Sequence, residues 1–304
     1  MKRILIFGGT GFVGRHLCEA LNSRDVQITV VTRRLPARSI QMLPRVQVVV
    51  ADIDDTQALQ PLVSEHDLVI NLIAILHGQE ADFERLHVQW PQALARLCAR
   101  AGVQRLIQVS ALGADPHGPS MYQRSKGRGE AALLSVSHET GLPLQLLRPS
   151  VIFGLDDQFI NLFARLQRVA PLMPLAGART RFQPVWVRDV AQALVALTLD
   201  APCRPQTQVI HEACGPEVMT LADLVRHAGR WARCERPVLE LPWSVGALQG
   251  WLMEVMPGRT LMSRDNVDSL RVDNVSSQQH PGLIELSITP RSLASVSGLP
   301  GSTP

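Results

Sequence analysis

The chain has 304 residues, of which 46% are hydrophobic and 19% charged, and its formal net charge is +3. This size and balance predict one or two globular domains with a substantial core. They argue against a disordered chain, no apolar run is long enough to span a membrane, and no basic tract with interleaved aromatic residues indicates nucleic-acid binding.

The first predicted element is a strand over 3–7 that runs directly into a glycine-rich turn and a helix over 12–23. In such a turn the first glycine bends the chain, the second lets backbone approach a pyrophosphate, and the third packs helix on strand. The helix start then offers N–H groups to the anion. The alternative is a β–α turn without a ligand. The residues expected to bind the pyrophosphate are Gly8, Gly9, Thr10, Gly11, Phe12, Val13 and Gly14.

The first half of the chain continues as apolar strands alternating with helices. Continuous apolar strands separated by helices are typical of a parallel sheet covered on both faces. We therefore predict an α/β fold with a doubly wound, Rossmann-type parallel sheet, whose ligand lies at the carboxyl ends of the strands. The further strands are expected at 27–32, 46–51, 67–72, 105–110 and 144–147, and the helices at 56–64, 83–101 and 122–140.

After residue 153 the alternation loosens, and we predict a smaller C-terminal cap domain. The nucleotide-binding domain would comprise 1–153 and 183–212, and the substrate, cap or docking domain 154–182 and 213–304. From residue 278 a Ser-, Gly- and Pro-rich tail is expected to be extended or partly loose. Helices are expected at 159–169, 189–199, 220–234 and 243–256, and strands at 185–187, 209–211 and 237–241.

The end of the second strand indicates which dinucleotide is bound. It carries Arg33 and Arg34 where an NAD-binding fold usually has an acid. Arginine at this point favours the 2′-phosphate of NADP(H), because the guanidinium group is positively charged and presents several N–H donors in one plane. NADP(H) is therefore the preferred cofactor and NAD(H) the alternative, unless the two arginines are ordinary solvated loop charges.

The ends of the next two strands add further cofactor candidates. Asp52 can accept a hydrogen bond from an adenine amino group while Ile53 packs on the ring, although Asp52 also suits a plain helix cap. The fourth strand ends at Asn71, and Leu72 and Ala74 follow it with small side chains or backbone along the path to the nicotinamide ribose.

A tyrosine and a lysine four residues apart are the reactive candidates. Tyr122 is the only tyrosine of the chain, and Lys126 is one of only two lysines. On a helix these positions share one face, so the ammonium group can lower the tyrosine pKa and hold the ribose. Tyr122 would then transfer a proton as general acid or base. Ser110, at the end of the fifth strand, is a candidate anchor for a substrate oxygen, or else a serine bonded to backbone.

Metal and disulfide sites are not indicated. The five cysteines are scattered, and the nine histidines show no ligand spacing. We expect no metal and a reducing compartment, hence the cytoplasm, since the first strand leaves no room for a leader peptide.

Together these motifs resemble the short-chain dehydrogenase/reductase superfamily, in its extended or atypical branch with NAD-dependent epimerases and dehydratases. The resemblance adds Pro149, after Arg148, to the expected cofactor site. It extends over about residues 2–200. Its motifs are the glycine turn, Asp52-Ile53, 71–74, the Tyr–Lys pair, Arg148-Pro149 and 185–191.

More narrowly, the chain resembles the atypical group that contains the nucleotide-binding accessory subunit of respiratory complex I and its bacterial relatives. The segments 109–115, 147–154, 157–159 and 180–185 carry this likeness, and 288–298 more weakly. The group implies tightly held NADPH with little or no turnover. The chain departs from the inactive pattern because it has both Tyr122 and Lys126. It also departs from active epimerases, which usually have a hydroxyl side chain one or two residues after the position of Ser110. Here those two positions are Ala111 and Leu112, which have no hydroxyl.

Two main hypotheses about function follow from these residues. A third, that the protein is a redox-sensing regulator with the same fold, would need no reactive tyrosine. The first is an NADPH-dependent oxidoreductase or epimerase-like enzyme with a small-molecule substrate. The second is a catalytically silent, NADPH-loaded accessory or assembly subunit, peripheral to the inner membrane, whose partners are respiratory-complex subunits. Helix 243–256 would then be its docking surface, or else cap-domain core. Residues expected near a substrate are Phe153, Gln158, Asn161, Gln183 and Arg188.

Overall fold

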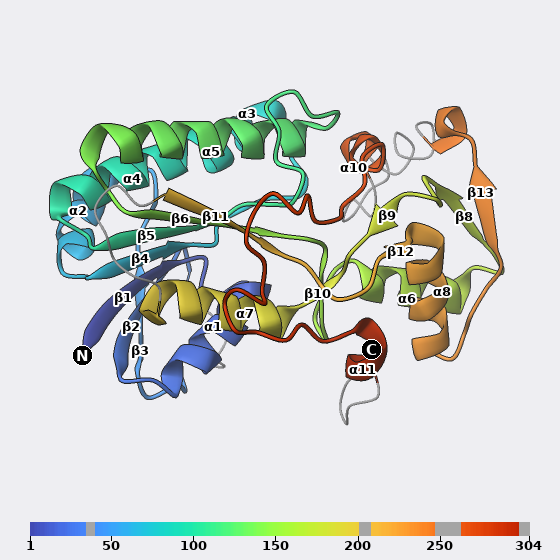
Figure 1. The fold of residues 1–304 in the computed structure, drawn as a ribbon, viewed down its shortest axis with the longest axis horizontal. Helices are drawn as coiled ribbons and strands as arrows, with labels where there is room; N and C mark the ends of the chain where they lie inside the picture. The colour runs from blue at the N-terminus through green and yellow to red at the C-terminus, as the bar shows by residue number, and fades with distance from the viewer. Residues whose placement is uncertain (35–39, 201–207, 247–262, 298–304) are drawn as a thin grey trace.

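The computed structural model describes residues 1–34, 40–200, 208–246 and 263–297. At its centre lies a seven-stranded sheet in the order β11-β6-β5-β4-β1-β2-β3, with every neighbouring pair parallel (Figure 1). The winding reverses between β1 and β4, which confirms the predicted doubly wound sheet. The strands are β1 (Lys2–Phe7), β2 (Val26–Thr32), β3 (Val46–Val50), β4 (Leu68–Asn71), β5 (Arg105–Val109), β6 (Leu144–Pro149) and β11 (Gln208–Ala213).

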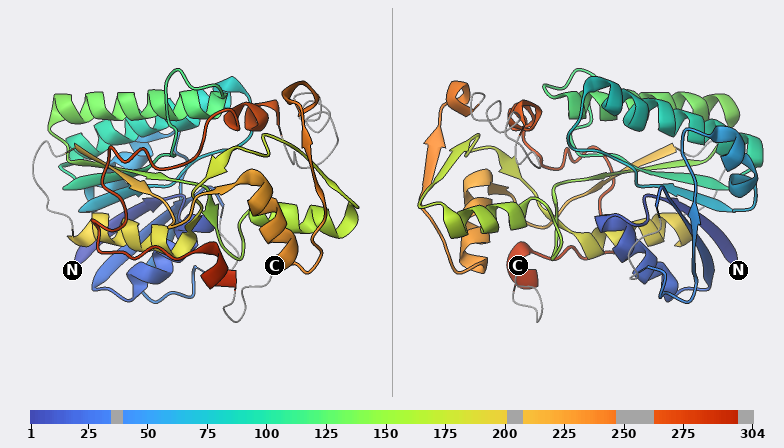
Figure 2. Two further views of the ribbon diagram at one scale, coloured as in Figure 1. Left: turned by 45° about the vertical axis from the view of Figure 1, so that its right-hand side comes forward. Right: turned by 180° about the vertical axis from the view of Figure 1, so that it is seen from behind.

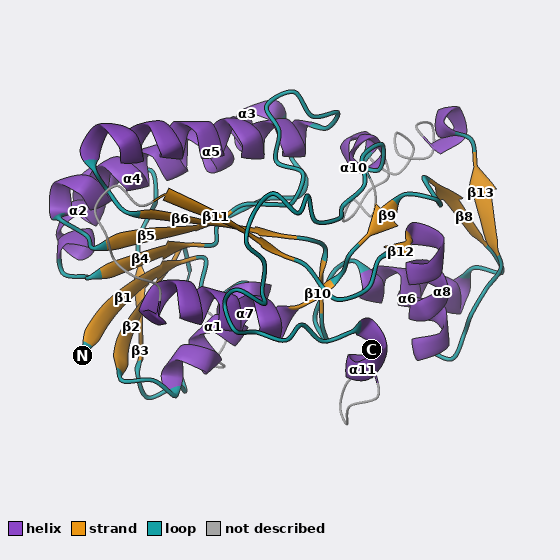
Figure 3. Cartoon of the chain, viewed as in Figure 1, coloured by secondary structure: helices purple, strands orange, loops and turns teal. Residues whose placement is uncertain are grey.

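Helices cover both faces of this sheet (Figures 1 and 3). Alternate residues of β1 serve opposite faces, so Ile4 and Ile6 belong to one buried cluster while Leu5 and Phe7 belong to the other. The first face is covered by α1 (Phe12–Asn22) and α7 (Val187–Val195), and the second by α2 (Thr56–Ser64), α4 (Trp90–Ala101) and α5 (Met121–Thr140).

The single helix expected over 83–101 is three segments in the structure. They are α3 (Glu80–Glu84), the π-helical η1 (Arg85–Gln89) and α4. Pro91 explains the irregularity, because it has no N–H to bond to the carbonyl of His87. That carbonyl instead lies against α5, where a Cβ on Gly129 would come within 1.9 Å of it. The helix expected over 189–199 likewise begins earlier, as α7, and ends in the π-helical η2 (Ala196–Asp200).

A smaller body of elements follows the sheet, on the right in Figure 1 and in two further views in Figure 2. Its own apolar core includes Phe163, Leu175, Leu224 and Val225. This confirms the predicted smaller C-terminal part, while the residue boundaries of the two domains stay a prediction. Its elements are α6 (Ile160–Val169), β8 (Met173–Ala176), β9 (Arg181–Phe182), β12 (Met219–Thr220), α8 (Leu221–Trp231) and β13 (Val238–Leu241). The paired strands β7 (Ile152–Phe153) and β10 (Val185–Trp186) lie between the two parts and contribute side chains to both cores.

The C-terminal segment, expected to be extended or partly loose, is packed on the fold rather than loose in its described part. Residues 281–288 return to the main sheet, where the Pro281 carbonyl accepts from Glu212 N–H at 2.9 Å and Leu283 joins the core beside α1 and α7. Leu293 and Val296 instead join the core of the smaller part. Composition failed to predict this because a few apolar side chains suffice to anchor the segment. Two short helices lie in this region, α10 (Arg264–Ser269) and α11 (Leu293–Ser297). Of the helix expected at 243–256, residues 243–246 are helical and the remainder lies outside the described residues.

Candidate functional site

The glycine turn between β1 and α1 lies at the point where the sheet reverses its winding. Gly8 has φ +80°, a left-handed conformation that favours glycine, and its carbonyl accepts from Gly11 N–H at 3.0 Å. A Cβ on Gly14 would lie 2.5 Å from the Gly8 oxygen and from the Gly9 Cα. Gly11 is the N-cap of α1 and makes no side-chain cap hydrogen bond. The first N–H groups of α1 therefore have no side chain competing with an anion, and the turn fits a pyrophosphate.

Of the other residues in the turn, some pack against the core and others contact a neighbouring loop. Val13 packs against the core on the α1 face, and Thr10 is half-buried. The ring of Phe12 points toward the loop after β7, since a Cβ on Gly154 would lie 3.1 Å from its Cζ. This side of the turn is thus closed by the smaller part of the molecule.

The side chains expected at the adenosine half lie at the ends of β2 and β3. Arg33 and Arg34 are exposed, and the Arg34 carbonyl accepts from Thr32 Oγ1 at 2.8 Å. Asp52 is exposed, whereas Ile53 is buried in the core between the sheet and α2. The ring-packing role expected for Ile53 therefore has little side-chain surface available, while both arginines and Asp52 have room to meet a ligand.

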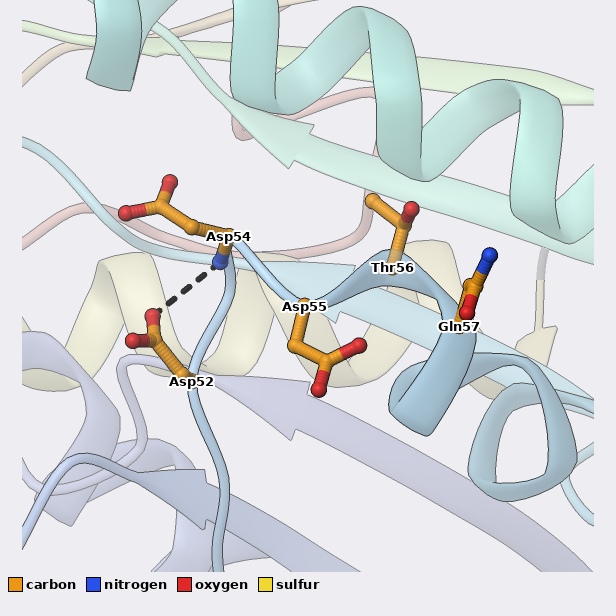
Figure 4. Close-up of a pocket in the computed structure, with 5 residues that line it drawn as sticks. All are labelled: Asp52, Asp54, Asp55, Thr56 and Gln57. Carbon is orange, nitrogen blue, oxygen red and sulfur yellow. Dashed lines mark hydrogen bonds between the residues drawn. The ribbon is translucent and has the colours of Figure 1, made fainter.

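A shallow acidic hollow surrounds Asp52 (Figure 4). The carboxylates of Asp52 and Asp54 project to the same side, and Asp52 Oδ1 accepts from Asp54 N–H at 3.1 Å. Asp54 is ion-paired with Arg85 at 2.7 Å, and Asp55 caps α2 by accepting from Ala58 N–H at 2.9 Å. Among the described residues, Asp52 is thus neither ion-paired, as Asp54 is, nor used as the cap of a helix, as Asp55 is. The hollow is lined by Asp52, Asp54, Asp55, Thr56 and Gln57.

The segment after β4 lies beside the glycine turn through its backbone. A Cβ on Gly8 would lie 3.1 Å from the Leu72 carbonyl carbon, and Ala74 is exposed. The side chain of Asn71 is buried and bonded within the fold, donating to Gln108 Oε1 at 2.8 Å and accepting from Trp90 Nε1 at 3.2 Å. Asn71 therefore fixes this edge of the sheet, and the backbone after it forms the wall beside Gly8.

The structure brings Tyr122 and Lys126 together with the end of β5. Lys126 Nζ lies 5.9 Å from the centre of the Tyr122 ring and donates to the Val109 carbonyl at 3.4 Å. The next residue, Ser110, is 4% exposed, and its hydroxyl has no hydrogen-bond partner among the described residues. A buried hydroxyl without a partner is uncommon, and a ligand oxygen would satisfy it.

Burial determines the acid–base state of the pair. It raises the pKa of Tyr122 to about 12, which corrects the expectation that Lys126 lowers this pKa. Burial also lowers the pKa of Lys126 to about 8, with Glu130 opposing that shift. Near pH 7 the phenol is therefore protonated and the amine mostly charged. Glu130 also receives two hydrogen bonds from Arg148 Nε, at 2.9 and 3.2 Å, and Pro149 follows with its carbonyl accepting from Leu112 N–H at 2.9 Å.

Sequence reasoning missed His87, which connects the segment after β4 to α5. Its Nε2 accepts from Ile75 N–H at 3.1 Å, so Nδ1 carries the proton and donates to Ser125 Oγ at 2.9 Å. Ser125 in turn donates to the Tyr122 carbonyl at 2.9 Å. Burial and the charge of Lys126 lower the pKa of His87 to about 2, so the ring is neutral. No pattern in the sequence indicates that His87 links Ile75 to Ser125, because it is a single histidine in a helix without the spacing of a metal ligand.

Three of the side chains expected near a substrate are engaged inside the smaller part. Phe153 is fully buried, and Asn161 Nδ2 donates to the Leu155 carbonyl at 2.7 Å. Gln183 donates to the Gly215 carbonyl at 2.8 Å. Gln158 and Arg188 are exposed and could meet a substrate, although the Arg188 guanidinium lies over the Trp186 ring, 5.4 Å from its centre.

Two further findings concern metals and membranes. Within the described ranges, no group of three or more His, Cys, Asp or Glu side chains is arranged to hold a metal ion. Among the helices that the structure describes, none has the length and apolar character needed to cross a bilayer.

The glycine turn at the switch point of a doubly wound sheet defines an NAD-binding protein of the Rossmann type. The family described as "NAD dependent epimerase/dehydratase family" matches residues 4–206, and the chain belongs to it. This confirms the resemblance to the extended short-chain dehydrogenases/reductases.

Individual relatives agree with this assignment. The Mus musculus protein named NADH dehydrogenase (ubiquinone) 1 alpha subcomplex subunit 9, mitochondrial, is 32% identical over 95% of this chain and 76% of its own. A Caulobacter vibrioides ceramide reductase is 31% identical over 64% of this chain and 60% of its own. The solved structure of MoeE5 with UDP-glucose and NAD has a TM-score of 0.73 at 17% identity, covering 95% of this chain and 94% of its own. The last likeness concerns the fold alone.

Proposed function

We propose that this protein is an NADP(H)-dependent oxidoreductase or epimerase-like enzyme that uses Tyr122 as its acid–base group. The observation that carries the proposal is the meeting of Tyr122, Lys126 and the unpartnered hydroxyl of Ser110 at the carboxyl end of β5. The bound nicotinamide would supply or accept a hydride. The chain's own residues would hold the substrate oxygen and move its proton.

Each of the three side chains has a distinct role in this proposal. Ser110 donates a hydrogen bond to the substrate oxygen. Tyr122, protonated near pH 7 because its pKa is raised to about 12, gives its proton to the oxygen that becomes a hydroxyl. The ammonium of Lys126 stabilises the phenolate that remains. These protonation states favour the reductive direction at neutral pH.

Cofactor choice is a separate part of the proposal. Arg33 and Arg34 are exposed at the end of β2, where the ribose of a dinucleotide bound to the glycine turn would lie. Their charge and donor geometry support NADP(H) over NAD(H).

The test is an assay of NADPH oxidation against a panel of carbonyl compounds and nucleotide sugars, with Tyr122→Phe as the matched variant. The phenylalanine keeps the ring and loses only the proton donor, so turnover is expected to fall about 10²–10⁴-fold. NADPH affinity, measured by its fluorescence, should stay within about twofold, since the phosphate-binding turn is untouched. Equal turnover of the two proteins would exclude the proposed role of Tyr122.

A second candidate function rests on the extent of similarity. The mitochondrial complex I subunit of Mus musculus aligns with 95% of this chain, whereas the ceramide reductase aligns with 64%. This supports an accessory subunit that retains NADPH as a structural group. Affinity purification of the tagged native protein in mild detergent, followed by mass spectrometry, tests it. Co-purification of respiratory-complex subunits supports this candidate, and recovery of the protein alone contradicts it.

A further inference from the structure

The first turn of α5, which carries Tyr122, is held by a carboxylate from a distant part of the chain. Asp265 in α10 accepts hydrogen bonds from the backbone N–H groups of Met121 and Tyr122, the latter at 3.1 Å. The helix supplies its own cap only to the next residues, where Ser120 Oγ accepts from Gln123 N–H at 3.1 Å. The initial N–H groups of a helix have no partner within it, so Asp265 completes a turn that α5 leaves open.

Asp265 is itself held firmly in place. Asp265 is only 8% exposed, and its backbone carbonyl accepts a hydrogen bond from Ser269 Oγ at 3.0 Å. Its helix begins with a cap in which Ser263 Oγ accepts from Asn266 N–H at 3.1 Å.

The chain that follows α10 is fixed to the end of β6 and to the loop after β5. Asn274 Oδ1 accepts from Ser150 Oγ at 2.7 Å and from Val151 N–H at 2.9 Å. Its Nδ2 donates to the Leu112 carbonyl at 3.3 Å, two residues after Ser110. The segment 263–277 therefore contacts both α5 and the loop beside Ser110, and Figures 1 and 2 show α10 beside the end of α5 where the helix begins.

We propose that Asp265 is a positioning residue, which fixes the first turn of α5 and thereby the place of the Tyr122 side chain relative to Lys126 and Ser110. Tyr122 is the second residue of α5, so an unpartnered first turn would fray at the reactive side chain itself. An effect of Asp265 on proton transfer by Tyr122 rests on the function proposed above. Its effect on the position of the Tyr122 side chain does not depend on that function.

The single tyrosine makes this measurable without a substrate. In protein labelled with ¹³Cζ-tyrosine, the one NMR signal arises from Tyr122. Asp265→Ala is expected to shift and broaden this signal in the folded protein. Asp265→Asn, which keeps one acceptor oxygen, should restore part of the change. The matched control is Asp268→Ala, in the same helix, whose exposed carboxylate bonds to Arg271 at 3.0 Å; it should leave the signal unchanged.

NADPH fluorescence serves as the second readout, and affinity should stay within about twofold in all three variants, because the glycine turn is a separate segment. A Tyr122 signal in folded Asp265→Ala identical to wild type would overturn the inference. If Asp265→Ala does not fold, the signal of Asp265→Asn decides in the same way. A shifted signal in a protein that turns over no substrate would uphold the positioning role while contradicting the proposed enzymatic function.

Discussion

The two ends of the candidate site are built differently. The phosphate-binding end comes from one contiguous segment, 8–14, whose turn is closed by the Gly11 N–H bond to the Gly8 carbonyl and by the close approach of Gly14 to Gly8 and Gly9. The reactive end joins distant segments, since His87 and Ser125 are 38 positions apart and Met121 and Asp265 are 144 apart. The first can form once a strand and a helix pack together. The second requires the whole tertiary structure, so the two ends should respond differently to substitution.

The largest effect is expected at the phosphate-binding end, from Gly14→Ala. The added Cβ would meet backbone at 2.5 Å, which cannot move aside without opening the turn. NADPH affinity, followed by fluorescence, should fall at least about 100-fold. Gly102→Ala is the control, because its Cβ meets nothing within 4 Å and its φ of +69° costs only about 1–2 kcal/mol of stability. If both variants bind NADPH equally well, the turn is not the phosphate site.

At the reactive end, Lys126→Met should increase stability while abolishing function. Burial lowers the pKa of Lys126 to about 8 in the folded protein, against about 10.4 when unfolded. Between these values the unfolded chain binds more protons at Lys126, so the contribution of Lys126 to the free energy of unfolding rises with pH through this window and is least favourable below pH 8.

The methionine removes the penalty of burying the charge, and we expect a gain of about 1–3 kcal/mol at pH 7. Urea unfolding at pH 7 and pH 10 measures it, and the gain should shrink at the higher pH. Lys2→Met, at an exposed residue, is the control. A lower urea midpoint for Lys126→Met than for wild type at pH 7 would contradict the prediction.

Changing the end of β2 should alter cofactor choice without affecting the reactive end. Replacing Arg33 and Arg34 by serine should lower NADPH affinity about tenfold and leave NADH affinity nearly unchanged, because only NADPH has a 2′-phosphate. Fluorescence titration with both cofactors measures the ratio. Arg24→Ser, just before β2 at its other end, is the matched control. Parallel losses for NADPH and NADH would show that the arginines do not discriminate between the cofactors.

The smallest effect is expected for Asp52→Asn. The carboxylate is exposed and, within the part of the chain that the structure describes, bonds only to the nearby Asp54 N–H. Its loss should therefore weaken the binding of both cofactors by about two- to fivefold. Glu65→Gln, at the far end of α2, should change neither affinity. Titration of the two variants side by side separates the outcomes, and equal affinities would leave Asp52 outside the binding site.

The same contrast explains what the sequence could predict. Apolar strands alternating with helices determine a parallel sheet, so the six strands through β6 and the glycine turn followed from local patterns. Helix α2 begins and ends at the predicted residues. The spacing of Tyr122 and Lys126 was readable because i and i+4 share a helix face.

What could not be predicted depends on contacts between distant residues. Nothing near Asp265 in the chain indicates that it bonds to the start of α5. Likewise, nothing near Asn71 indicates that its side chain is hydrogen-bonded to Gln108 and Trp90. Strands of two residues such as β9 and β12 exist only because they pair with each other. The π-helical turn at 85–89 depends jointly on Pro91 and on the close approach of Gly129.

The position of Asp265 near the end of the chain has a consequence for synthesis. A nascent polypeptide can form β1, the glycine turn and most of the sheet well before residue 265 leaves the ribosome, and domains generally fold as they emerge. Until then α5 lacks the acceptor for its first turn, and Leu283 has not closed the core beside α1. If Asp265 has the role proposed above, a chain that stops before residue 265 would form the glycine turn without fixing the position of Tyr122, and competence to bind a dinucleotide would precede reactive competence during biosynthesis.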